Sequence, residues 1–231
     1  MMHKNYIRDF NEKGYIVLSN VFDSKDCEKI IKDVNNIKVK DNDYLPLMNP
    51  HKNYKSIMNA MANNKIVKFI ETYFENEARG LQTEFFFMPP NTKGFTPHQD
   101  NTYVQADEDS FISAWVALTD VNEHNGGLII WPESHNEKKL ESIENIEKNT
   151  ANQDPNARSR ISILPNHYKK ISPSMKQGDV IMIHSWLAHA SNDNKSNANR
   201  HALLCTYLKK GANFRPGNTA KRKPFKLISS I

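Results

Sequence analysis

The chain has 231 residues, of which 38% are hydrophobic and 10% aromatic, and its formal net charge is +5. This length fits one domain with a substantial core, and the aromatic content argues against a disordered chain. No apolar run approaches the roughly 20 residues of a membrane span, and the first residues lack the apolar segment of a signal peptide. We therefore expect a cytoplasmic protein that does not bind a membrane.

The positive charge is concentrated in a C-terminal tail, residues 209–231. This tail carries +7 and no acidic residue, so the rest of the chain carries −2; the seven basic residues are Lys209, Lys210, Arg215, Lys221, Arg222, Lys223 and Lys226. Because no basic stripe occurs elsewhere, we expect no specific nucleic-acid binding. A solvated tail is the favoured interpretation; in the alternative, Arg215, Lys221 and Arg222 lie across the mouth of a site and attract an anionic substrate.

Helical spacing of apolar residues marks the first third of the chain. It predicts a short helix over 6–12 that ends near Gly14, a strand in YIVLSN at 15–20, and a helix that Asp23 or Ser24 caps. A further helix is predicted over about 64–74. Cys27 and Cys205 fall in apolar or amphipathic surroundings, which favours two buried thiols over a disulfide.

From residue 82 onward the pattern changes to short apolar runs separated by Pro, Gly and Asn, which is typical of antiparallel strands. The runs are 82–88, 113–118, 127–131, 179–184 and 201–208. We therefore expect a mainly β fold with flanking α-helices, a sandwich or jelly roll, in a single domain over 1–231. The polar stretch at about 135–167 interrupts the strands and is either a rim or lid insertion or a surface loop without a role.

The first chemical motif is the His-x-Asp of His98 and Asp100. In an extended chain, residues two apart project to the same side and can hold one ion together. The pair is common by chance, so it needs support from elsewhere in the chain.

Support comes from residues 178–200. A turn leads into an apolar strand that ends at His189, a polar stretch of turn formers follows, and Arg200 opens the next strand eleven residues after His189. If the polar stretch is a hairpin connection, His189 and Arg200 lie on adjacent strands. His184 is the rival third ligand, but its place inside the apolar strand and its offset from Arg200 favour His189.

Two histidines and one carboxylate form a facial triad that leaves three coordination positions open, the arrangement of non-haem iron(II) oxygenases. The open positions account for the arginine. A 2-oxoglutarate molecule chelates iron through its C1 carboxylate and keto oxygen, and its far carboxylate needs a bidentate cation such as Arg200. The residues thus predict an iron(II) site with 2-oxoglutarate as co-substrate.

The sequence resembles the phytanoyl-CoA dioxygenase family of iron- and 2-oxoglutarate-dependent oxygenases. The shared motifs run through most of the chain: GYIVL at 14–18, HQDNTY at 98–103, SAWVALTDV, NGGL, WPESH, and GDVIMIH…LAHAS…N…S…R at 178–200. By this similarity the metal ligands are His98, Asp100 and His189, and Arg200 binds the 2-oxoglutarate carboxylate. Gln99, Trp115 and, on the strand before the His-x-Asp turn, Gln82 match positions near the co-substrate.

The resemblance also implies a double-stranded β-helix of the jelly-roll, cupin-like type and the reaction of the family. O2 is consumed, 2-oxoglutarate is decarboxylated to succinate and CO2, and a small molecule is hydroxylated. Asp100 is intact, whereas relatives that halogenate carry a small residue there, so hydroxylation is favoured. Tyr103 follows the motif closely enough to contact substrate, or else it carries a structural hydroxyl.

A second hypothesis is a jelly-roll protein that binds a metal or ligand without turnover. Arg200 argues against it, because metal binding alone has no use for that cation. The small chain with its basic tail weakly favours an anionic or zwitterionic substrate. The sequence specifies neither the substrate nor the oligomeric state.

Overall fold

The structure is a computed structural model that describes residues 2–35, 46–145 and 159–228. Four helices come first: α1 (Met2–Lys13), α2 (Ser24–Val34), α3 (Lys55–Met61) and α4 (Asn64–Phe74). The rest is mainly strand, with one short helix, α5 (Asp100–Val104), and short 3-10 turns η1 (Pro50–Lys52) and η2 (Ser134–Glu137). No helix in these ranges is long and apolar enough to cross a membrane, and the cytoplasmic location remains a prediction.

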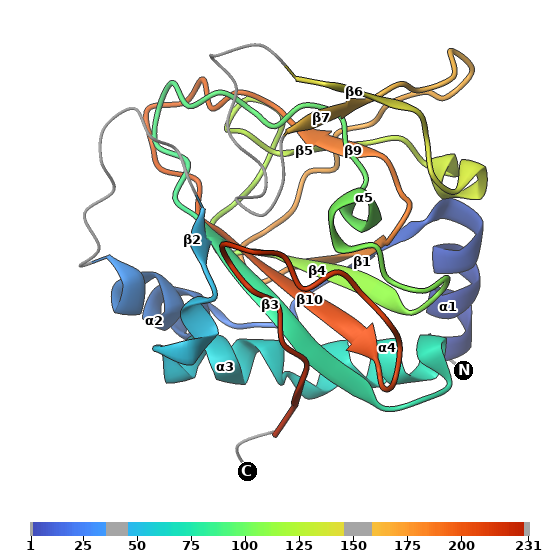
Figure 1. The fold of residues 1–231 in the computed structure, drawn as a ribbon. Helices are drawn as coiled ribbons and strands as arrows, with labels where there is room; N and C mark the ends of the chain where they lie inside the picture. The colour runs from blue at the N-terminus through green and yellow to red at the C-terminus, as the bar shows by residue number, and fades with distance from the viewer. Residues whose placement is uncertain (1, 36–45, 146–158, 229–231) are drawn as a thin grey trace.

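A seven-stranded antiparallel sheet forms the centre of the molecule, in the order β1-β8-β4-β10-β3-β11, with β2 also paired to β3 (Figure 1). Its strands are β1 (Tyr15–Leu18), β2 (Leu47–Met48), β3 (Ala78–Phe86), β4 (Phe111–Ala117), β8 (Val180–His184), β10 (Ala202–Lys209) and β11 (Phe225–Lys226). Two small antiparallel sheets lie over one face: β5 (Leu128–Ile130) with β9 (His189–Ser191), and β6 (Ser142–Glu144) with β7 (Arg160–Ser162). The fold is the predicted jelly roll.

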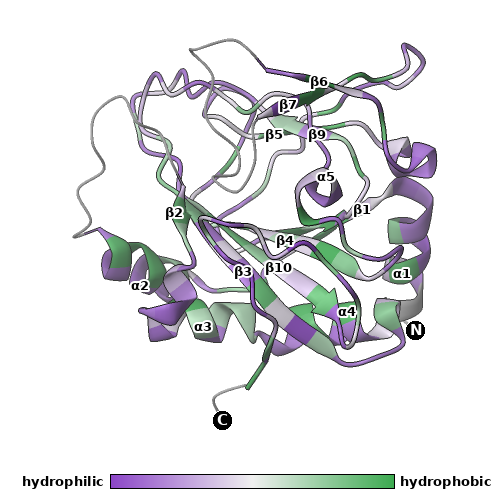
Figure 2. Ribbon diagram, viewed as in Figure 1, coloured by the Kyte–Doolittle hydropathy of each residue, from purple (hydrophilic) through white to green (hydrophobic). Residues whose placement is uncertain are grey.

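The strand alternation separates two cores, because successive side chains of a strand point to opposite faces of the sheet. On β4, Ile112, Ala114 and Val116 pack against the helices, whose inner faces are apolar in Figure 2. Trp115 and Ala117 belong to a second cluster, between the large sheet and β5–β9. The site described below lies on this second side.

The helices largely confirm the sequence prediction. Asp23 caps α2 through a hydrogen bond that its side chain accepts from the backbone N–H of Asp26. The helix α4 has the predicted bounds, whereas α1 is longer than expected and α3 was not predicted. Cys27 and Cys205 are buried free thiols.

The predicted hairpin between His189 and Arg200 is wrong. The apolar strand ends at His184, a turn follows in which the Leu187 N–H donates to the His184 carbonyl, and His189 begins the separate strand β9. This strand pairs with β5 in the small sheet, whereas β10, which follows Arg200, pairs with β3 and β4 in the large one. The two residues therefore face each other across the jelly roll rather than along one ladder.

The stretch 135–167 contains η2, β6 and β7, and its residues 146–158 lie outside the described ranges. A lid role for it remains a prediction.

The favoured interpretation of the tail as solvated is wrong for its middle part. The strand β11 pairs with β3, the ring of Phe225 stacks on His51 with centroids 4.9 Å apart, and Arg222 is 4% exposed. The sequence pattern missed this because two residues of strand are too short to show periodicity.

Candidate active site

Three predicted ligands meet in one place. Among the described residues, His98, Asp100 and His189 form the one cluster of His, Cys, Asp or Glu donors suited to a metal, with one ligand atom of each within 4.8 Å of the others. Asp100 Oδ1 lies 3.7 Å from His98 Nε2 and 3.5 Å from His189 Nε2. Two imidazoles and one carboxylate on one side leave the opposite side open, as a facial triad requires.

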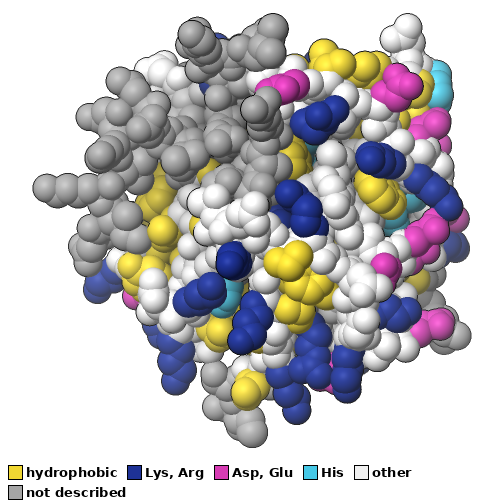
Figure 3. All heavy atoms as spheres, in the orientation of Figure 1, with side chains coloured by type: hydrophobic (Ala, Val, Ile, Leu, Met, Phe, Trp, Pro, Cys, Tyr) yellow, Lys and Arg dark blue, Asp and Glu magenta, His cyan; other side chains and the backbone are white. Residues whose placement is uncertain are grey.

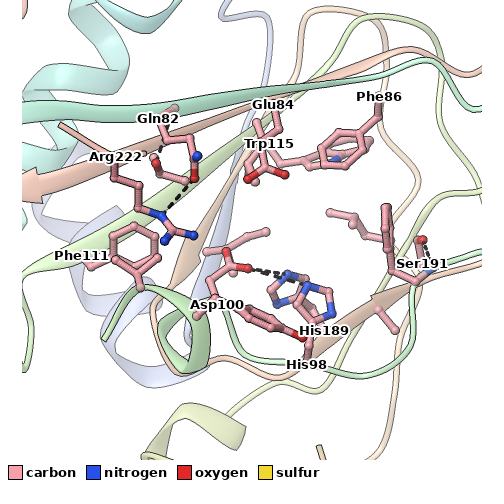
Figure 4. A pocket seen from close by; sticks show the side chains of 18 of the residues that line it. Gln82, Glu84, Phe86, His98, Asp100, Phe111, Trp115, His189, Ser191 and Arg222 are labelled. Carbon is pink, nitrogen blue, oxygen red and sulfur yellow. Dashed lines mark hydrogen bonds and ion pairs between the residues drawn. The ribbon is translucent and has the colours of Figure 1, made fainter. Parts of the chain in front are cut away.

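Backbone pairing holds the two histidines together. The N–H of each donates to the carbonyl of the other at 2.9 Å, in an isolated antiparallel bridge. Asp100 is not in an extended strand as predicted, because it is the first residue of α5; Gln99 before it is extended. The start of the helix turns the carboxylate toward the two rings (Figure 4).

Each ligand has an outer partner that orients it. His98 Nδ1 lies 2.8 Å from the Thr96 carbonyl and His189 Nδ1 lies 3.0 Å from the Leu187 carbonyl, so both Nδ1 atoms donate and both Nε2 lone pairs face Asp100. The Ser113 hydroxyl donates to Asp100 Oδ2 at 2.5 Å, which leaves Oδ1 toward the rings.

The electrostatics suit a cation. Burial lowers the pKa of His98 to about 4, so its ring is neutral. Burial opposes ionisation of Asp100, but His189, His98 and the Ser113 hydroxyl together hold its pKa below the ordinary value. Burial also opposes protonation of His189, and Asp100 outweighs it and raises the pKa of His189. A carboxylate that attracts positive charge, with imidazole nitrogens beside it, is a donor set that fits iron(II).

The triad lies in the wall of a cavity of about 730 Å³, including its open mouth. The floor is the large sheet, where Gln82, Glu84 and Phe86 alternate along β3 and point into the cavity (Figure 4). Their partners on β10 are Thr206 for Gln82 and Leu204 for Glu84, and both of these also line the cavity.

Arg200 reaches the same cavity from the loop that precedes β10, in the large sheet, whereas His189 belongs to the small sheet. It is 2% exposed, its guanidinium carbon lies 5.2 Å from the centre of the Trp115 ring, and one Nη contacts the sulfur of Met88. Trp115 lines the cavity too. A buried guanidinium on an aromatic wall is a strong site for a carboxylate.

Gln82 and Tyr103 line the cavity, whereas Gln99 is not among its lining residues. The Gln99 side chain is fully buried and donates to the carbonyls of Lys138 and Trp186 at 2.6 Å each, while its Oε1 accepts from the Leu140 N–H at 2.9 Å. Gln99 thus ties two loops together behind the His-x-Asp turn. The Tyr103 hydroxyl accepts from the Arg160 N–H at 3.2 Å.

His184, the rival ligand, lies outside the cavity lining and pairs with Asp109 at 3.5 Å. Sequence reasoning missed Glu84, Phe111 and Ser113. For Arg222 it favoured a solvated tail, with a place across the mouth of a site as the alternative. Strand alternation from Gln82 predicts that Glu84 faces the same side. No local pattern predicts the inward place of Arg222.

Comparison with known proteins supports the resemblance. The profile of the family described as Phytanoyl-CoA dioxygenase (PhyH) matches residues 10–202. Phytanoyl-CoA dioxygenase 1 of Oryza sativa subsp. japonica is 33% identical over 125 residues, which are 53% of this chain and 42% of the rice protein. The match thus spans less than half of that relative. A probable alpha-ketoglutarate-dependent hypophosphite dioxygenase of Stutzerimonas stutzeri is 24% identical over 226 residues, covering 87% of this chain and 76% of that protein.

Solved structures share the fold at low sequence identity. The epimerase SnoN, in complex with Fe3+, alpha ketoglutarate and nogalamycin RO, superposes with a TM-score of 0.76 at 14% identity, over 93% of this chain and 86% of SnoN. EctD from S. alaskensis, with 2-oxoglutarate and 5-hydroxyectoine, gives 0.67 at 18% identity, over 89% and 75%. Because the family profile matches most of this chain, residues 10–202, the chain belongs to the phytanoyl-CoA dioxygenase family.

Proposed function

We propose that this protein is an iron(II)- and 2-oxoglutarate-dependent dioxygenase that hydroxylates a small anionic or zwitterionic molecule. The observation that carries the proposal is the convergence of His98, Asp100 and His189 with the buried Arg200 in one cavity. A metal-storage or purely structural site has no need for a buried guanidinium beside the metal ligands. Family membership and the Fe3+ and 2-oxoglutarate bound in structural neighbours support the same assignment.

In this proposal the triad holds iron(II) through two Nε2 atoms and the Asp100 carboxylate. Arg200 donates paired hydrogen bonds to the far carboxylate of 2-oxoglutarate, and the indole of Trp115 forms an apolar wall beside it. Iron bound there, with 2-oxoglutarate and O2, would supply the oxidation of a C–H bond to C–OH, one oxygen atom of O2 entering the hydroxyl and the other the succinate, with CO2 released.

The protein's own contribution is orientation and exclusion of water. The carbonyls behind His98 and His189 keep both rings in one tautomer, and the Ser113 hydroxyl keeps one Asp100 oxygen directed at the metal. The apolar side chains of Phe86, Phe95 and Leu128 line the same cavity as Arg200, and an apolar lining strengthens charge pairing.

The test is to mix purified protein anaerobically with iron(II) and 2-oxoglutarate and to record the weak visible charge-transfer band of the complex. We expect the band in the parent, none with Asp100→Ala, and a weaker one at equal 2-oxoglutarate with Arg200→Ala. Arg8→Gln is a matched surface control, since its side chain is 65% exposed on α1. A parent that neither retains iron nor develops the band would overturn the oxygenase and leave the ligand-binding jelly roll.

A further inference from the structure

The C-terminal segment brings a second buried arginine to the cavity. Arg222 is 4% exposed and lines the cavity together with Gln82 and Phe111. In Figure 4 it extends from the edge of the view past Gln82 toward the interior, beside Phe111. Neighbouring Lys221 and Lys223 are exposed, so the burial is specific to Arg222.

The segment around Arg222 is anchored on both sides. Before it, the Arg215 side chain donates to the Tyr103 carbonyl at 2.9 and 2.6 Å, at the end of α5. After it, Phe225 pairs with Gly80 on β3 and its ring fills the space over that glycine, where an added Cβ would come within 2.5 Å of the ring. The Arg222 N–H itself donates to the Pro216 carbonyl at 2.8 Å.

Two neutral acceptors help to hold the guanidinium of Arg222 in place. Its Nε donates to Gln82 Oε1 at 3.1 Å, and Nη1 donates to the Arg215 carbonyl at 3.4 Å. Gln82 is held in turn, because its Nε2 donates to the Ala220 carbonyl at 3.1 Å. A cation that is desolvated and preoriented in this way is a strong receptor for an oxyanion that enters the cavity.

The two buried arginines serve different parts of the cavity. Arg200 stacks on Trp115, whereas Arg222 lies beside Phe111. In Figure 4 Arg222 and Phe111 are on one side of the triad, and Phe86 and Ser191 are on the other. If 2-oxoglutarate binds Arg200, as the proposed function requires, Arg222 is a second cation in the cavity that can receive the molecule that is oxidised.

The outer surface favours the arrival of anions. Figure 3 shows Lys and Arg side chains gathered on the lower half of this face, where the C-terminal segment lies in Figure 1. A positive surface around a cavity raises the local concentration of negatively charged ligands.

The charge balance of the cavity further limits the class of substrate that it suits. Its described lining carries two acidic residues, Glu84 and Asp100, and two arginines, Arg200 and Arg222, so these four charges cancel. Iron(II) and doubly charged 2-oxoglutarate also cancel each other. A substrate that has no net charge, but offers an anion to Arg222 and a cation to Glu84, adds no net charge to this lining.

We propose that Arg222 and Glu84 form the substrate subsite of this enzyme and that the substrate is a small zwitterion, with its carboxylate or phosphonate group on Arg222 and its cationic group beside Glu84. Glu84 is 7% exposed and lies two residues from Gln82 on β3, about 7 Å along the strand. Because Arg222 Nε lies 3.1 Å from Gln82 Oε1, this spacing suits a molecule whose two charges are a few bonds apart. The assignment rests on the proposed function for the place of 2-oxoglutarate.

The test is calorimetric titration of the anaerobic iron(II)–2-oxoglutarate complex with matched probes. These are the ω-amino acids from glycine to 6-aminohexanoate, the fatty acids and alkylamines of equal length, and 3-aminopropylphosphonate to separate a phosphonate from a carboxylate. We expect at least one zwitterion to bind about tenfold or more tighter than the acid and the amine of its length, since each lacks one charge pair.

Substitutions assign the two ends of the probe. Arg222→Gln should weaken the zwitterion and the acid by roughly 10- to 100-fold and leave the amine unchanged, and Glu84→Gln should weaken the zwitterion and the amine but not the acid. Arg222→Lys keeps the charge and should lose less affinity for these probes than Arg222→Gln does. This comparison separates a loss of anion recognition from a displacement of the tail. Lys223→Gln, an exposed neighbour in the same segment, should bind all probes as the parent does.

The proposal would be overturned if the parent and Arg222→Gln bound the acids and the zwitterions with the same affinity. It would also be overturned if the amines bound most tightly to the parent, or if no acidic probe bound to it. Failure of the proposed function is distinguishable, because it shows as a missing iron–2-oxoglutarate band in the parent. The titration is therefore repeated on metal-free protein, where Arg222 and Glu84 are still present and should still favour zwitterions over amines.

Discussion

Arg200 and Arg222 are two nearly fully buried cations that line one cavity, and they reach it by different routes. Arg200 precedes the central strand β10, and its backbone N–H donates to the Met88 carbonyl at 3.0 Å. Arg222 lies in an irregular segment of the C-terminal tail that returns over β3 and ends in the two-residue strand β11. Arg200 lies within the family match, which ends at residue 202, and Arg222 belongs to a segment beyond it.

This difference indicates a division of roles. The co-substrate is common to the family, and its proposed receptor stands directly before a central strand, where the backbone is fixed by the hydrogen bond to Met88. The substrate is individual, so its receptor is placed on a peripheral segment that can vary without disturbing the framework. The following substitutions should separate the two arginines.

The largest effect is expected at Arg200. Replacement by Gln removes the cation expected to pair with the far carboxylate, so the concentration of 2-oxoglutarate needed for half-maximal band intensity should rise about 100-fold. The zwitterionic probes should bind as before, since Arg222 is untouched. A parallel loss of probe affinity would mean that the two arginines act on one ligand.

A smaller effect is expected at Ser113, which acts on the metal and on neither arginine. Ser113→Ala removes the hydrogen bond to Asp100 Oδ2, and we expect iron(II) affinity to fall about 30-fold, within the range for lost outer partners of metal ligands. Iron titration monitored by the visible band measures the change. Ser113→Thr keeps the hydroxyl and should restore most of the affinity; no recovery would point to packing instead.

The anchoring of the tail is tested at Phe225. Phe225→Ala removes the ring from Gly80 and His51, and we expect the free energy of unfolding to fall by about 1.5 kcal/mol, because the ring is only partly buried. Urea unfolding measures this. The same variant should bind zwitterions more weakly than the parent, with 2-oxoglutarate binding unchanged. Gly80→Ala should have the same two effects, because the added methyl group displaces the Phe225 ring. Unchanged probe affinity in both variants would separate the tail from the subsite.

The smallest effect is expected at Gln82, which holds Arg222 without contacting the metal. Gln82→Leu removes one hydrogen bond to the guanidinium, so zwitterion affinity should fall about fivefold. Calorimetry on the loaded protein measures it. A loss of 2-oxoglutarate affinity instead would place Gln82 at the co-substrate, as the family resemblance first suggested.

Local patterns in the sequence determined a large part of this protein. The spacing of Ile66, Phe69, Ile70 and Phe74 marked α4 because a helix repeats its buried face every three to four residues, and the short apolar runs marked β3, β4, β5, β8 and β10. Motifs of fixed local order predicted that the three candidate metal ligands and Arg200 share one site, and these residues line one cavity. The expected hairpin between His189 and Arg200 was wrong.

Tertiary structure alone decided which segments face one another. The pairing of β9 with β5 depends on contacts between residues far apart in sequence, and so does the return of the tail to β3. The same contacts decide that Arg222 is buried while Lys221 and Lys223 are exposed. Gln99 shows the same limit of local patterns. It lies between two proposed metal ligands in sequence, but its amide donates to the carbonyls of Lys138 and Trp186. Periodicity reports which side of an element is buried, whereas the partner on that side is selected by the packing of the whole chain.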